Sequence, residues 1–72
     1  MSADLNMSVA PMIALVGERL DQAKALAEAA VGLAARRNIK AAVSKLLEVE
    51  PSLYEVTTLV DAASLIHRLT RP

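Results

Sequence analysis

The stretch AARRNIKAAV, residues 34–43, decides how this chain folds, because the hydrophobic pattern changes direction across it. The apolar residues before it recur at steps of three and four, which is typical of an amphipathic helix. At about 100° per residue, that stripe has a mean direction of about 165° on a helical wheel. The next apolar set, which begins at Ile39, has a mean direction of about 300° on the same wheel. We therefore expect a break near Arg37 and a second helix capped by Asn38. A bent continuous helix is the alternative.

The first helix is predicted to be the longest, beginning at Ser8 or Ala10 so that Pro11 falls in its first turn. Residues 1–7 would form a flexible arm, and residues 8–72 a single helical domain. A row with the heptad spacing of a coiled coil consists of Val9, Ile13, Val16, Leu20, Ala23, Ala27, Ala30 and Ala34. The alanines in its second half predict a close approach of a partner helix.

The stretch VEPSLYE, residues 49–55, predicts a second turn and a third helix. Pro51 biases the residue before it away from helical geometry, so the second helix should end where this stretch begins. Ser52, followed three residues later by Glu55, matches a capping box. The third helix would then occupy residues 53–69.

The predicted third helix is apolar over about 200° of its circumference, wider than the usual stripe of about 100°. Its two neighbours in the chain cover only part of that arc, so a second copy of the protein, or another protein, would cover the rest. The expected fold is therefore all-α, either a three-helix bundle or a bent helical hairpin, completed by oligomerisation. The predicted partner interface consists of Val9, Ile13, Val16, Leu20, Ala23, Ala27, Tyr54, Val56, Leu59, Val60, Ala63 and Ile66.

The composition argues against catalysis and cofactor binding. The chain has no cysteine and one histidine, which leaves no conventional metal site and no thiol nucleophile. Its serines lie in no nucleophile motif, and its two glycines are too far apart for a phosphate-binding loop. We expect neither an enzyme nor a cofactor. His67 is interpreted as a partly buried residue with one hydrogen bond, and a pH-dependent contact between subunits is the alternative.

Charge is segregated along the chain, and the two blocks are interpreted as solvated faces, with electrostatic steering of a partner as the alternative. The basic residues concerned are Arg36, Arg37, Lys40 and Lys45. A second interpretation is a helix-turn-helix-like DNA-binding transcriptional regulator built from residues 39–69. The net charge of zero argues against nucleic acid, as do Glu55 and Asp61 in the recognition helix, because both would meet phosphate.

The apolar run of residues 9–16 is too short to span a bilayer, which takes about 20 residues. No basic residue precedes it, as one would in a signal peptide. The chain is therefore expected to be soluble and cytoplasmic. Its expected function is protein–protein association, as an adaptor, a regulator, a secretion-type chaperone or a self-assembling subunit, through burial of an apolar helix face against a partner.

Overall fold

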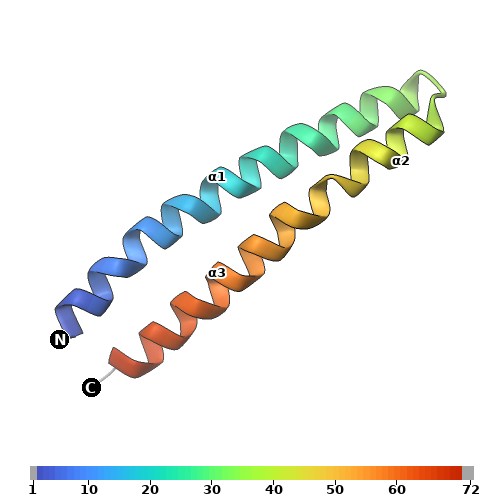
Figure 1. Ribbon diagram of the computed structural model, residues 1–72. Helices are drawn as coiled ribbons and strands as arrows, with labels where there is room; N and C mark the ends of the chain where they lie inside the picture. Colours follow the sequence, from blue (N-terminus) through green and yellow to red (C-terminus); the bar gives the residue numbers. More distant parts are fainter. Residues whose placement is uncertain (1, 71–72) are drawn as a thin grey trace.

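The computed structural model describes the backbone of residues 2–70 and the side chains of residues 8–70. Helix α1, Ser2–Ala35, forms one arm of a hairpin, while α2, Ile39–Leu47, and α3, Val49–Thr70, follow each other along the second arm. Figure 1 shows the arms side by side, with the α1–α2 turn at one end. The hairpin is 55 Å long and 14 × 13 Å across. The predicted all-α fold with its longest helix first is confirmed, and the second arm is a bent helix.

The turn after α1 forms at the predicted place and is held by hydrogen bonds of the backbone and of the Asn38 side chain. The backbone N–H of Asn38 donates to the carbonyl of Leu33 at 3.0 Å, and that of Arg37 donates to the carbonyl of Ala34 at 2.9 Å. Arg37 has a φ of 62°, so the pair of bonds forms a Schellman motif with arginine in the left-handed position that glycine usually takes. Asn38 caps α2 as predicted, because its side chain accepts a hydrogen bond from the backbone of Ala41 at 3.3 Å.

The joint between α2 and α3 differs from the prediction. Helix α3 begins at Val49, so Pro51 lies in its first turn and Ser52 lies inside the helix instead of capping it. Proline has no N–H and its ring clashes with the carbonyl four residues earlier, which belongs to Leu47, the last residue of α2. The break therefore falls at Glu48. Pro51 is tolerated just after it, since the first N–H groups of any helix have no partner within the helix.

Helix α1 begins at Ser2, so the predicted start at Ser8 or Ala10 is wrong. Residues 2–7, predicted to be an arm, have a helical backbone. Pro11 consequently lies inside the helix. It costs α1 one backbone hydrogen bond, because proline cannot donate to the carbonyl four residues earlier.

Each arm contributes one heptad row of side chains that faces the other arm, and we call the two rows the seam. On α1 the seam consists of Val9, Met12, Val16, Arg19, Ala23, Leu26, Ala30 and Leu33. On the second arm it consists of Ala42, Lys45, Val49, Ser52, Val56, Leu59, Ala63, Ile66 and Thr70. All of these residues are buried or half-buried. The row keeps its spacing through the joint at Glu48, so α2 and α3 pack against α1 as one bent helix.

The row predicted from the sequence coincides with the seam of α1 at every second residue and departs from it at the others. Ile13 and Leu20 are 63% and 46% exposed, whereas Met12 and Arg19 are half-buried. The cause is that α1 carries two adjacent rows with the same heptad spacing. Hydrophobicity favours Ile13 and Leu20 over Met12 and Arg19, so the spacing alone does not identify which row faces the second arm.

In the half nearest the α1–α2 turn, small buried side chains alternate along the seam with larger half-buried ones. The buried residues of the described chain are Ala23, Ala30, Ala42 and Ser52, and no large side chain is fully buried there. Small side chains allow two helices to approach closely, since the distance between helix axes depends on the residues at the contact. A core of alanines removes little apolar area from water, however, so the packing of the hairpin contributes little stability.

Candidate protein-interaction face

A second heptad row lies on each arm, one residue after the seam. On α1 it comprises Ala10, Ile13, Gly17, Leu20, Lys24, Ala27, Val31 and Ala34. On the second arm it comprises Ile39, Val43, Leu46, Glu50, Leu53, Thr57, Val60, Ser64 and His67. Every one of these residues is exposed except Ala27, which is half-buried. We call the two rows together the apolar face.

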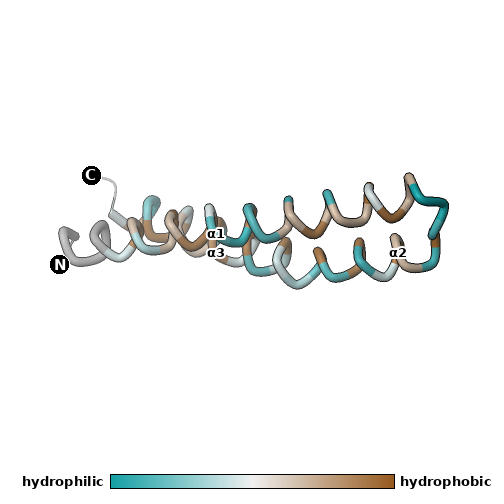
Figure 2. Tube along the Cα trace, turned by 90° about the horizontal axis from the view of Figure 1, so that it is seen from above, coloured by the Kyte–Doolittle hydropathy of each residue, from teal (hydrophilic) through white to brown (hydrophobic). Residues whose placement is uncertain are grey.

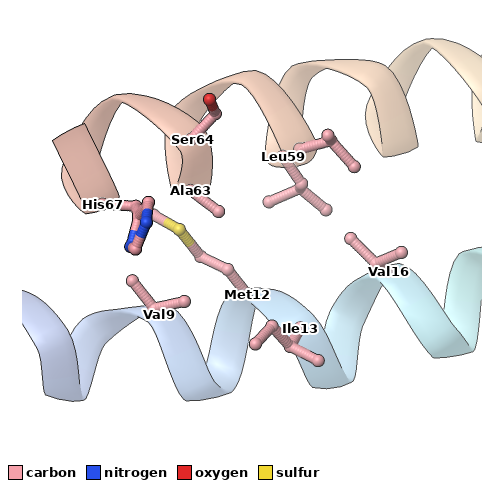
Figure 3. A pocket seen from close by; sticks show the side chains of 9 residues that line it. Val9, Met12, Ile13, Val16, Leu59, Ala63, Ser64 and His67 are labelled. Atoms are coloured by element: carbon pink, nitrogen blue, oxygen red, sulfur yellow. The ribbon is translucent and has the colours of Figure 1, made fainter.

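The two rows lie on the same side of the hairpin. In an antiparallel pair of helices, the residues that follow matching seam positions project to one side of the pair. A groove of about 430 Å³ between α1 and α3 provides direct evidence, because its lining includes Ile13 from one row and Val60 and His67 from the other. Figure 3 shows this groove, in which Met12 of α1 reaches toward His67.

Most of the large hydrophobic side chains that remain exposed belong to this face. Among the described side chains, twelve large hydrophobic residues are exposed. The eight that lie on the apolar face are Ile13, Leu20, Val31, Ile39, Val43, Leu46, Leu53 and Val60. Their exposed fractions range from 46% to 70%. An exposed apolar surface of this kind, interrupted at its middle by Lys24 and Glu50, is typical of an interaction site.

The opposite side of the hairpin is polar across its middle. There, Nε of Arg19 donates to Oε2 of Glu55 and forms an ion pair between α1 and α3. The same guanidinium donates through Nη1 to Oε1 of Gln22 at 3.1 Å. A charged residue in a heptad seam favours the register in which it finds its partner. This ion pair therefore helps to fix how α1 and α3 align.

The residues predicted at a partner interface occupy three places. Seven of them face the other arm within the hairpin, namely Val9, Val16, Ala23, Val56, Leu59, Ala63 and Ile66. Ile13, Leu20, Ala27 and Val60 lie on the apolar face. Tyr54 is 75% exposed and lies away from that face, beside Leu15 and Glu55.

Five large residues of the apolar face were missed by the sequence reasoning. They are Val31, Ile39, Val43, Leu46 and Leu53. The signal that could have found them is the second heptad row, which becomes apparent once the first row is assigned to the contact between the arms. His67 is exposed, and the structure thus differs from the interpretation as a partly buried residue.

The basic residues predicted to steer a partner are divided between two sites. Arg36, Arg37 and Lys40 are exposed at the α1–α2 turn, which is the hydrophilic end of the hairpin in Figure 2. Lys45 lies half-buried in the seam, and its Nζ pairs with Oε2 of Glu48 at 3.2 Å. Of the four predicted residues, the three at the turn therefore carry the exposed positive charge of that end.

The arrangement of α2 and α3 differs from that of a helix-turn-helix motif. In such a motif the two helices cross at about 90–120°. Here α2 and α3 run in succession along α1, as Figure 1 shows. The start of α3 also carries Glu50, an acid where a recognition helix would approach the phosphate backbone.

No group of three or more histidine, aspartate or glutamate residues is placed to hold a metal ion in the described part of the chain. Within residues 2–70, no helix is both long and apolar enough to cross a membrane.

Comparisons with models of protein families, with curated proteins and with solved structures found no match for this chain.

Proposed function

We propose that this protein is a non-enzymatic helical interaction module that binds another protein surface through its apolar face. The observation that carries the proposal is the gathering of eight exposed large hydrophobic residues on one side of the hairpin. A residue of this size contributes about 1.5–3 kcal/mol when it passes from full exposure to full burial. These eight side chains are already partly covered in the hairpin, so each contributes correspondingly less, yet the sum over eight is large compared with the few kcal/mol by which small domains are stable.

The surface area of the hairpin supports the proposal independently. The accessible area is 5498 Å². A compact protein of 7.6 kDa exposes about 4300 Å², so the hairpin exposes about 1200 Å² more than its mass requires. Chains of this size seldom have enough core to be stable without a staple or a partner. Burial of the apolar face would supply the missing core.

The proposed mechanism is the packing of one helix pair against another helical surface. Such a module could serve as an adaptor, a regulator, a secretion-type chaperone or a self-assembling subunit. We place it in the cytoplasm, since a chain without cysteine has no need of an oxidising compartment.

Two leucines of α3 provide a matched test of the proposal. Leu53 on the apolar face is 48% exposed, and Leu65 on another side of the same helix is 50% exposed. We expect Leu53→Glu to weaken association at least tenfold, because a charge would be buried at the contact. Leu65→Glu should leave association unchanged. The measurements are sedimentation equilibrium of each purified chain and capture from host extract with each chain as bait.

The two variants make the result decisive. Self-association, or capture of a host protein, that is lost in Leu53→Glu and kept in Leu65→Glu would support the proposal. Equal behaviour of the two variants in both measurements would contradict it, because association would then not depend on the apolar face.

A further inference from the structure

We propose that the apolar face is covered by a second copy of this chain, packed face to face about a two-fold axis parallel to the arms. Both α1–α2 turns would then lie at the same end of a four-helix bundle. This inference rests on the proposed function and names its partner.

The area of the face suits a stable dimer. Its row on α1 extends from Ala10 to Ala34, which corresponds to about 36 Å of helix. Two helices side by side present a width of about 20 Å, so each copy would bury roughly 700 Å². Stable interfaces of standard size bury about 800 Å² from each partner. The face is therefore large enough for a second copy without help from any other surface.

The charges of the face select the orientation of the second copy. Lys24 is the single charged residue of the α1 row, and Glu50 is the single acidic residue of the row on the second arm. Both are exposed. In the seam, Ala23 and Ser52 lie at the same distance from the turn, one on each arm. Lys24 is one residue from Ala23 and Glu50 is two residues from Ser52, both on the side nearer the turn. Lys24 and Glu50 therefore lie at about the same level along the hairpin.

Rotation about an axis parallel to the arms places α1 of one copy on the second arm of the other copy at the same level. Lys24 then faces Glu50 of the second copy, and Glu50 faces its Lys24, so the dimer contains two ion pairs. The other face-to-face rotation puts the turns at opposite ends and stacks α1 on α1. Because the α1 row has no acid and the other row has no lysine or arginine, that dimer stacks neither Lys24 nor Glu50 on a residue of opposite charge.

The side-chain sizes near the turn also match in the proposed orientation. There the α1 row has the small residues Ala27 and Ala34, which would meet Leu46 and Ile39 of the second copy. Alternation of large and small residues at facing positions allows helical layers to interdigitate. Near the other end the same register brings Ile13 to Val60, so two large apolar side chains meet there.

Charge reversal tests the pairing without disturbing the core. Lys24→Glu alone places two glutamates together at both sites, and Glu50→Lys alone places two lysines together. We expect each variant to self-associate roughly tenfold more weakly than the natural chain. An equimolar mixture of the two should recover the natural affinity, because the mixed dimer contains two opposite pairs. The measurement is sedimentation equilibrium of each variant and of the mixture.

A matched control uses the same charge changes outside the apolar face. Arg68 and Glu28 are both exposed and lie in neither row. Arg68→Glu and Glu28→Lys should each dimerise like the natural chain, and their mixture should do the same. A mixture of Lys24→Glu and Glu50→Lys that associates no better than the separate variants would overturn the proposed pairing.

A distance between the two turns tests the orientation itself. Arg36 is exposed at the turn, and the chain has no cysteine, so Arg36→Cys carries a single spin label in the full-length protein. We expect pulsed electron paramagnetic resonance to show two labels less than about 30 Å apart, since helices in a bundle are spaced by 8–10 Å. Labels separated by nearly the 55 Å length of the hairpin would overturn the orientation and leave the proposed function standing.

A monomer at every concentration would overturn the assignment of a second copy. The proposed function would then depend on whether Leu53→Glu loses a captured host protein that Leu65→Glu retains.

Discussion

The two broad sides of this hairpin are built on the same seam and differ only in the residues beside it. On one side, the rows next to the seam are mostly apolar, and their charged residues are Lys24 and Glu50. On the other, Arg19 and Glu55 pair across the arms and Gln22 joins them. The seam provides the contact between the arms on both sides, so the sides differ through the residues that flank it. We propose that the apolar side serves association, whereas the middle of the other side contacts water.

The largest effect is expected from damage to the seam that both sides share. Ala23 is 7% exposed between the arms, whereas Ala25 on the same helix is exposed. Ala23→Asp should lower the free energy of unfolding by about 3 kcal/mol or more, because it buries an unpaired charge. Ala25→Asp should cost less than about 1 kcal/mol. Thermal unfolding followed by circular dichroism measures both, and equal losses would show that Ala23 does not lie between the arms.

A smaller effect is expected from a change on the apolar side alone. Leu20→Glu should weaken association at least tenfold, because its side chain, 46% exposed in the hairpin, would be covered in the complex. Gln22→Glu, on the polar side of the same helix, serves as the control. Sedimentation equilibrium of both variants gives the comparison. An equal loss in the control would mean that the two sides do not differ in function.

A stabilising change is expected at the turn, which belongs to neither side. Arg37 holds a left-handed conformation with φ 62°, which costs a residue with a side chain about 1 kcal/mol relative to glycine. Arg37→Gly should therefore raise the free energy of unfolding by about 0.5–1 kcal/mol. Arg36→Gly should lower it, since Arg36 does not have a positive φ and glycine only adds flexibility to the unfolded chain. Chemical denaturation measures both, and a loss of stability in Arg37→Gly would contradict the assigned turn.

The smallest effect is expected from the ion pair on the polar side. The side chains of Arg19 and Glu55 are 28% and 49% exposed, so water screens their attraction. A double-mutant cycle of Arg19→Ala and Glu55→Ala should give a coupling energy of about 1 kcal/mol or less, which declines as salt is added. Association through the apolar side should not change. Sedimentation of the double variant checks this point, and a monomeric double variant would contradict it.

The turns show how far the sequence alone determines the fold. The break near Arg37 and the cap at Asn38 were predictable, because the hydrophobic direction changes there and asparagine is a favoured cap. The joint at Glu48 was misplaced by a few residues, since Ser52 and Glu55 satisfy the capping-box pattern. In the structure Ser52 is instead a small buried residue of the seam. The local pattern favours Ser52 as a helix cap, whereas packing against α1 favours it as a small residue inside a helix. The structure has the arrangement that packing favours.

The apolar face could be predicted only in part, for a related reason. Ile13, Leu20 and Val60 stand out by hydrophobicity, and all three lie on the face. The orientation of α1 decides which of its two heptad rows is exposed, and Arg19 influences that choice through its contact with Glu55 on α3. A contact between residues so far apart in the chain is not visible in local spacing. The full apolar face can therefore be identified only once the arrangement of the two arms is known.

Small-angle X-ray scattering of the purified chain over a range of concentrations is the most direct test of the proposed face-to-face dimer. We predict a particle with twice the mass of the 7.6 kDa chain and a maximum dimension still close to the 55 Å of one hairpin, because the two copies lie side by side along their full length. A folded particle of 7.6 kDa with the same maximum dimension at every concentration would contradict it.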